Sequence, residues 1–322
     1  MKGTDGIAAW PRLGISTCLL GENVRYDGGH KHDRFLTDTF GRFVEWVPVC
    51  PEVECGLPVP RESMHLEGDP DDPRLVTSRT HIDHTDRMKK WAAMRLDELE
   101  RENLIGFVFK SRSPSSGMER VKVFDDKGMP HKVGVGIFAR AFMDRFPLLP
   151  VEDEGRLHDP LIRENFIERI FCLKRYRDAI AGRRTRGALV RFHSTHKLEI
   201  MAHSPKILRE MGRLVAQAKE HSAAELFGTY ERLLLDALRL KATPGKNANA
   251  IQHAMGSFKK DLTGDEKQEM LEVLERYRDG LFPLVVPVTL LRHYVRKYAP
   301  DYLVDQSYLN PHPVELKFRN HA

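Results

Sequence analysis

Two cysteines and a glutamate lie close together in the stretch WVPVCPEVECGLPVPRE. Cys50 follows the apolar run 46–49, Glu52 comes two positions later, and Cys55 completes the group. Thiolates bind soft metal ions and attack electrophiles, and a nearby carboxylate transfers protons. The stretch therefore favours metal or acid–base chemistry at the end of a buried strand.

Two other segments place polar residues at the ends of apolar runs. Cys18 ends the run 13–18 and is followed by the glycine-bearing loop GENVRYDGG, and the turn SPSSG (113–117) follows the run 105–110. Because the carboxyl ends of parallel strands share one edge of a sheet, ligands bind there. We therefore expect Cys18, the Cys50 stretch and the serine-rich turn to form one site.

Two kinds of metal centre are compatible with these cysteines. For a zinc site, the sequence offers neither of the usual CxxC or HxxxH pairs. Cys50 and Cys55 are five positions apart, and His30 and His32 are expected to lie in a surface loop. An iron–sulfur cluster takes thiolates from separate loops as readily as from one motif. We expect Cys172, on an apolar helix face, to be an inert buried thiol.

The elements that position the site alternate along the N-terminal half. Apolar runs predict strands, and a 3.6-residue apolar period predicts helices between them. The expected strands are 13–18, 44–50, 105–110 and 148–151; the expected helices are 85–102 and 135–146. Strands separated by helices predict an α/β domain with a mostly parallel sheet.

The chain from residue 163 onward has a helical period throughout. Breaks are expected at Gly182, at 243–245 and at Pro283. We interpret LLPVEDEGRLHDP (148–160) as the connection between an α/β domain of residues 1–155 and an all-α domain of residues 156–322.

Composition indicates a cytoplasmic protein without a membrane span. No segment approaches the roughly 18 apolar residues that a span needs, and no signal peptide is recognisable. Four cysteines in such a compartment are expected to stay reduced.

The charge is divided unevenly between the two halves of the chain. Residues 1–162 contain 23 Lys and Arg against 27 Asp and Glu, and residues 163–322 contain 28 against 19. The basic second half is typical of a module that binds a polyanion. The sequence carries no signal for a particular oligomeric state.

Several sequence blocks resemble known families. STCLLGENVRYDGGHK, VPVCPEVECGLPVPRE and FKSRSPSSGMERVKV are similar to the three signature blocks of the thiouracil desulfidase (TudS-like) family. LVRFHSTHKLEIMAHSP, TPGKNANAIQHAMGSFKKDL, PLVVPVTLLRHYV and YLNPHPVELKFRN resemble the YbgA-like helical domain that often follows it. Together they resemble the RudS-type tRNA 4-thiouridine desulfidases over about residues 11–318.

The resemblance implies a 4Fe–4S cluster that is held by three cysteines and has one open iron. Cys18 and Cys50 match two ligands, and Ser116 stands where the family usually has the third cysteine. Ser116 is either an engineered substitution, which we favour, or an oxygen ligand, or a position whose role Cys55 has taken. Under the first two explanations the cluster is expected to be labile.

The resemblance also implies a non-redox replacement of sulfur by oxygen on a thiolated base. We expect Glu52 to activate water and Ser113 to orient the base or the water. The alternative for Glu52 is capping of a loop. Arg25, Asp27, Lys110 and Arg112 are candidates for substrate binding or, equally, for structural ion pairs.

A basic helical domain fits a tRNA that contains 4-thiouridine as the substrate, because phosphate contacts supply affinity. Candidate tRNA-binding residues are Arg183, Arg184, Arg186, Lys197, Lys259 and Arg292. His193 and His196 could bind a metal ion, but such histidines more often pack or bind phosphate. The alternatives are a desulfidase of free thiouracil or 4-thiouridine monophosphate, and an RNA-binding protein without a cluster.

Overall fold

A computed structural model describes residues 9–182, 184–258, 260–316 and 318–320. The chain divides into two compact units, residues 9–166 and the part from residue 167 onward. This division falls inside helix α4 (Pro160–Ile180), later than the expected boundary at 155/156. The first turn of α4 interacts with the N-terminal unit, since Arg163 Nε donates to the Leu157 carbonyl at 2.6 Å and its guanidinium lies 4.1 Å from the Phe35 ring centroid.

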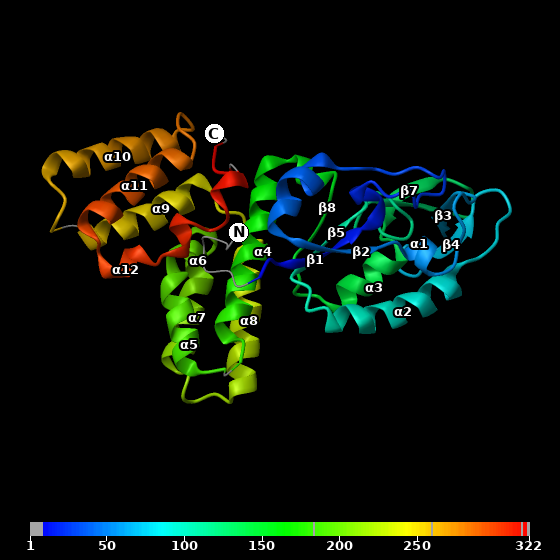
Figure 1. Cartoon of the computed structure of the whole chain (residues 1–322), viewed down its shortest axis with the longest axis horizontal. Coiled ribbons are helices and arrows are strands. Elements are labelled where there is room, and N and C mark those ends of the chain that lie inside the picture. Colours follow the sequence, from blue (N-terminus) through cyan, green and yellow to red (C-terminus); the bar gives the residue numbers. More distant parts are fainter. Residues whose placement is uncertain (1–8, 183, 259, 317, 321–322) are drawn as a thin grey trace. The chain divides into compact units, whose positions relative to one another are not determined.

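The N-terminal unit contains a parallel sheet with the strand order β2-β1-β5-β8 (Figure 1). Its strands are β1 (Arg12–Ser16), β2 (Glu45–Val49), β5 (Gly106–Phe109) and β8 (Val151–Asp153). The strands β1, β2 and β5 correspond to expected strands, whereas β8 begins at Val151, where the expected strand 148–151 ends. The α/β class with a parallel sheet is confirmed. The carboxyl ends of β1, β2 and β5 therefore lie at one edge.

Helices α2 (Thr85–Arg101) and α3 (Ile137–Arg145) lie side by side against this sheet (Figure 1). Phe107 and Phe109 on β5 stack on each other and contact Phe138 and Phe142 of α3. A Cβ at Gly14 would lie 2.1 Å from the Phe107 ring, so only glycine leaves room for that ring on β1. Burial of this aromatic core fixes the strands that carry the site.

A second, mixed sheet was not expected from the sequence. Its strand order is β4-β3-β6-β7, with bounds β3 (Met64–Glu67), β4 (Arg74–Thr77), β6 (Val121–Phe124) and β7 (Pro130–Gly134). The strands have four or five residues, and β7 is exposed along most of its length. These strands are no shorter than those of the parallel sheet, but β3 and β7 each bury only one residue. They therefore lack the apolar run by which the pattern identifies a strand.

The unit that begins at residue 167 is all-α among its described residues, as expected. Apart from the end of α4, its helices are α5 (Arg186–Thr195), α6 (Lys197–His203), α7 (Pro205–Ala216), α8 (Ala223–Arg239), α9 (Pro244–Met255), α10 (Gly264–Arg278), α11 (Val285–Tyr298) and α12 (Asp301–Val304). Side chains of Ser or Thr accept backbone N–H groups at five of their N-termini, which are the N-caps Thr185, Ser204, Ser222, Thr243 and Thr263. These caps explain why the helices start where they do. No helix in the described ranges is long and apolar enough to cross a membrane.

Candidate active site

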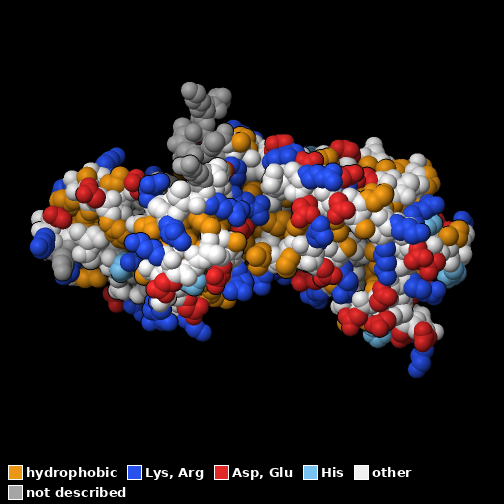
Figure 2. Space-filling model, turned by 90° about the horizontal axis from the view of Figure 1, so that it is seen from below, with side chains coloured by type: hydrophobic (Ala, Val, Ile, Leu, Met, Phe, Trp, Pro, Cys, Tyr) orange, Lys and Arg blue, Asp and Glu red, His pale blue; other side chains and the backbone are white. Residues whose placement is uncertain are grey.

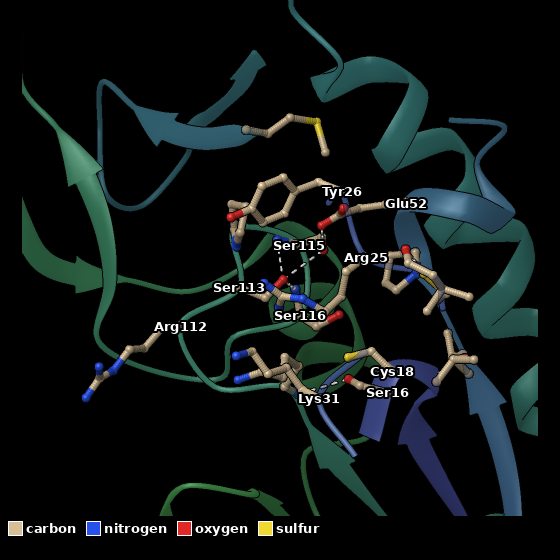
Figure 3. A pocket seen from close by; sticks show the side chains of 18 of the residues that line it. Ser16, Cys18, Arg25, Tyr26, Lys31, Glu52, Arg112, Ser113, Ser115 and Ser116 are labelled. Carbon is tan, nitrogen blue, oxygen red and sulfur yellow. Dashed lines mark hydrogen bonds between the residues drawn. The ribbon is translucent and has the colours of Figure 1, made fainter. Parts of the chain in front are cut away.

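Three loops that are remote in sequence meet in one cavity of about 460 Å³ at the carboxyl edge of the parallel sheet. Cys18, Cys50, Glu52, Ser113 and Ser116 all line it (Figure 3). The structure thus brings together the residues that the strand ends were expected to contribute.

Cys18 is held by a tight turn after β1. It belongs to the 3₁₀ helix Thr17–Leu20, which Gly21 ends in the left-handed conformation at φ 93°. The carbonyl oxygen of Cys18 accepts the N–H of Lys31 at 2.9 Å. The N–H of Lys110 donates to Ser16 Oγ at 2.9 Å, which joins the ends of β1 and β5. These bonds hold the first loop of the site in place.

Cys50 precedes the short helix α1 (Pro51–Glu54), and its N–H donates to Glu54 Oε1 at 2.7 Å. Burial raises the pKa of both Cys18 and Cys50 to about 11, because a thiolate loses hydration in the cavity. At neutral pH both thiols are therefore protonated unless a cation compensates the thiolate charge. Two such thiols facing one cavity suit a site for a soft metal centre.

Cys55 does not share this cavity. Its thiol donates to the Glu52 carbonyl oxygen at 3.3 Å, and its side chain packs against the hydrophobic core. Cys55 is therefore not among the residues that the cavity brings together, and a role as cluster ligand would require this packed side chain to move.

The serine-rich turn is shaped by its own hydrogen bonds and by helix α3. Ser113 Oγ accepts the N–H groups of Ser115 at 3.3 Å and Ser116 at 3.1 Å. The carbonyl oxygen of Ser115 accepts the N–H of Phe138 at 2.9 Å, so the turn caps the start of α3. A Cβ at Gly136 would lie 2.6 Å from the Ser115 carbonyl carbon, which shows how closely the two segments pack. The turn places the side chain of Ser116, which is 4% exposed, at the cavity wall.

Glu52 is held by two partners that the sequence did not reveal. Ser115 Oγ donates to its Oε1 at 2.8 Å, and Arg61 donates through Nε to its Oε2 at 2.9 Å and also through Nη2. These contacts fix the carboxylate toward the cavity (Figure 3). Arg61 occurs in the same quoted stretch as Glu52, but only the folded loop pairs the two side chains.

The expected substrate-binding residues have structural partners. Arg25 Nε lies 3.3 Å from Asp27 Oδ1, and Asp27 does not line the cavity. Lys110 Nζ is paired with Glu154 and also donates to the Ser111 carbonyl at 3.0 Å. The Arg112 guanidinium points away from Cys18 and Ser116 (Figure 3). The ion-pair alternative thus holds for Arg25, Asp27 and Lys110, although Arg25 and Lys110 still line the cavity.

A second cavity of about 710 Å³ adjoins the first, because both are lined by Met64, Ser111, Arg112 and Pro114. Its remaining wall is rich in cations. The basic side chains are Arg112, Arg120, Lys122, Lys132 and Arg156, against the acidic Glu119 and Asp153. The surface beside the thiol cavity is therefore suited to an anionic chain.

The candidate tRNA-binding residues have different environments. Arg183 and Lys259 lie outside the described residues, and Arg184 and Arg292 are exposed. Arg186 donates to the carbonyl oxygens of Ala218 and His221 at 2.7 and 3.1 Å, which is a structural contact. Lys197 lies 6.0 Å from the Tyr302 ring centroid.

His193 and His196 have separate hydrogen-bond partners in the helical unit. His193 Nδ1 is bonded to Tyr230 Oη at 3.2 Å, whereas His196 Nδ1 is bonded to the Phe192 carbonyl oxygen at 2.9 Å. The two rings therefore serve different parts of the helical unit.

Known proteins match each half of the chain separately. The family model described as 2-thiouracil desulfurase matches residues 13–154, and the model described as protein of unknown function DUF1722 matches residues 197–313. A curated relative, the uncharacterized protein YbgA of Escherichia coli (strain K12), is 29% identical over 153 residues, which is 47% of this chain and 90% of that protein.

The solved structures include one match, titled [4Fe-4S]-dependent thiouracil desulfidase TudS. It has 28% identity and a TM-score of 0.39, and the alignment covers 46% of this chain and 94% of that chain. The two family models confirm the resemblance that the motifs suggested. The chain therefore combines a segment that matches the 2-thiouracil desulfurase family, residues 13–154, with a segment that matches DUF1722, residues 197–313.

Proposed function

We propose that this protein is an iron–sulfur-dependent, non-redox desulfidase that acts in the cytoplasm on 4-thiouridine in tRNA. The observation that carries the proposal is the meeting of Cys18, Cys50, Glu52 and the serine-rich turn in one cavity. The match of residues 13–154 to the 2-thiouracil desulfurase family model supports the enzyme class.

The donor set fits a cluster at two of three positions. Cys18 and Cys50 offer thiols from two loops, and Ser116 offers a hydroxyl group from the third. Iron–sulfur clusters prefer thiolates, so Ser116 is a weaker ligand than cysteine would be. When bound, the cluster supplies a Lewis-acidic iron that withdraws electron density from the thiocarbonyl sulfur.

The residues around the cavity can then carry out a hydrolysis. Arg61 and Ser115 hold Glu52, and its Oε1 still has a free acceptor site for a water molecule. Glu52 takes one proton from that water as the oxygen adds to the C4 carbon of the base, and it passes this proton to the sulfur. It then takes the second proton from the new C4 hydroxyl group and delivers it to the sulfur as the C–S bond breaks. C=S and H₂O thus become C=O and H₂S, and no electrons are required.

Two features support an RNA substrate over a free base. The exposed ring of Tyr26 borders the thiol cavity and offers a stacking surface for an extruded base. The adjoining cationic cavity would receive the neighbouring phosphates.

The helical unit supplies further positive charge. On its face at the left of Figure 2, Lys and Arg side chains gather with some acidic side chains between them. Within the helical unit we assign tRNA contacts to Arg184, Lys197 and Arg292. Arg183 and Lys259, outside the described residues, stay candidates. Arg186 is excluded from this set because its guanidinium is occupied by backbone carbonyl groups.

The substrate is tested by comparing thiolated tRNA with free 4-thiouridine monophosphate under anaerobic conditions. We expect KM for tRNA to rise steeply with salt, since displaced counterions dominate such binding, and KM for the nucleotide to stay nearly constant. The double variant Lys122→Glu/Lys132→Glu should raise KM for tRNA and leave KM for 4-thiouridine monophosphate unchanged. Equal efficiency on both substrates, with equal salt dependence, would assign the enzyme to free nucleotides.

Ser116 favours one competing function, an RNA-binding protein without a cluster. A chain that binds thiolated tRNA but acquires neither iron nor sulfide, even as the Ser116→Cys variant, would support that function and refute the desulfidase.

A further inference from the structure

A second set of metal-binding side chains lies in the helical unit. Cys172 on α4, His196 at the junction of α5 and α6, and Glu199 on α6 place one donor atom each within 4.8 Å of the others. The three residues are 0%, 5% and 1% exposed. Neither the desulfidase chemistry nor the proposed tRNA contacts use them.

The His196 ring is prepared to donate a lone pair. Its Nδ1 lies 2.9 Å from the Phe192 carbonyl oxygen, which can only accept, so the proton resides on Nδ1. Stacking on the Phe192 ring, with 3.8 Å between centroids, fixes the orientation of the imidazole. The buried Nε2 has no hydrogen-bond partner among the described residues. This tautomer, held by a backbone carbonyl group, is the one in which histidine binds metal ions.

Glu199 is held in a corresponding way. Its Oε2 accepts the hydroxyl group of Ser307, whereas its buried Oε1 has no hydrogen-bond partner in the described part of the chain. An orphaned carboxylate oxygen and an orphaned imidazole nitrogen beside one thiol are costly unless something occupies the space between them.

We propose that Cys172, His196 and Glu199 bind a divalent transition-metal ion, with Zn²⁺ as the best match. Sulfur, imidazole and carboxylate ligands are the set that zinc takes in proteins, at about 2.0–2.3 Å from each. The three donor atoms already lie close enough together for one ion to reach them all after small side-chain adjustments.

The charge near the site is compatible with such an ion. Arg175 is the cation that acts on all three residues, and its Nη2 donates to the carbonyl oxygens of Asn310 and Pro311. The two anionic ligands of the set, the Cys172 thiolate and the Glu199 carboxylate, together offset the two positive charges of one divalent ion. The occupied site is therefore neutral beside Arg175.

Cobalt(II) is a suitable probe because its bond to a thiolate gives an absorption band in the near ultraviolet. The titration uses the full chain with Cys18→Ala and Cys50→Ala, so that the desulfidase cavity contributes no thiolate. We expect one Co²⁺ per chain with a thiolate band, displacement of that band by Zn²⁺, and a higher Tm with Zn²⁺.

Adding Cys172→Ser to this background should abolish the band and weaken Co²⁺ binding at least about tenfold, and Glu199→Gln should weaken it while keeping the band. Adding Cys55→Ala instead is the matched control, which should change neither. A titration without any thiolate band, or a band that survives Cys172→Ser, would overturn the proposal. Because the background lacks the desulfidase thiols, neither result depends on desulfidase activity.

Discussion

At the scale of single residues, Ser116 determines how well the cavity holds a cluster. Its side chain stands at the wall that Cys18 and Cys50 share, and a hydroxyl group is a poorer iron ligand than a thiolate. Ser116→Cys should raise iron and acid-labile sulfide after anaerobic reconstitution toward one full cluster per chain, together with activity. Cys55→Ser is the control and should leave the iron content as it is, because Cys55 faces the core. Equal iron and sulfide in the unsubstituted chain and the Ser116→Cys variant would remove this explanation.

Glu52 is the residue whose loss should slow the chemical step most. Ser115 and Arg61 hold its carboxylate at the cavity, where it can exchange a proton with water. Glu52→Gln keeps the size and most contacts but removes the base, so single-turnover rates should fall by about 10²–10⁴-fold. Iron content should not change.

Glu62→Gln is the neighbouring control, because Glu62 bonds to Thr80 outside the cavity and should be dispensable for the rate. If Glu52→Gln kept the full single-turnover rate with an intact cluster, Glu52 would have only the structural role of capping its loop.

At the scale of elements, the serine-rich turn depends on its fit against α3. A Cβ at Gly136 would meet the backbone of Ser115 and Gly117 at 2.6 and 2.8 Å. Gly136→Ala should therefore destabilise the fold by about 1–3 kcal/mol, measured by denaturant unfolding, and should lower the iron content. Gly228→Ala on α8, where nothing lies within 4 Å, should instead stabilise the fold by up to about 1 kcal/mol. An unchanged free energy of unfolding for Gly136→Ala would show that the serine-rich turn can shift away from α3 without cost.

The sequence predicted the elements that carry strong periodic signals. Strands β1, β2 and β5, helices α2 and α3, and the placement of Cys18, Cys50 and the serine-rich turn at one edge follow from apolar runs and from the geometry of parallel sheets. The second sheet was missed because β3 and β7 bury only one residue each and so have no apolar run.

Contacts between distant side chains could not be read from local patterns. The Arg61–Glu52 pair depends on how one loop folds, and the Lys110–Glu154 pair joins residues on two different strand ends. Cys172 looked inert because its neighbours in sequence are apolar, whereas its polar neighbours come from other helices.

At the scale of the whole molecule, acid should weaken the fold through buried neutral histidines. Burial lowers the pKa of His193 to about 4, below its usual 6.5. The unfolded chain therefore takes up a proton before the folded chain does, and stability should fall as the pH drops from about 6.5 to 4. His193→Gln should flatten this part of the Tm–pH curve. His293→Gln, at an exposed position, is the control and should keep the wild-type slope. An identical slope in the wild-type protein and His193→Gln would contradict the assignment.

For the whole molecule we propose that the helical unit binds tRNA and that the cavity replaces the sulfur of its 4-thiouridine with oxygen from water. The most direct measurement uses the anaerobically reconstituted Ser116→Cys chain, thiolated tRNA and ¹⁸O-labelled water, without any electron donor. We expect one sulfide released for each 4-thiouridine lost and one heavy oxygen in each uridine formed. A full cluster with no loss of sulfur, or unlabelled uridine, would contradict the proposal.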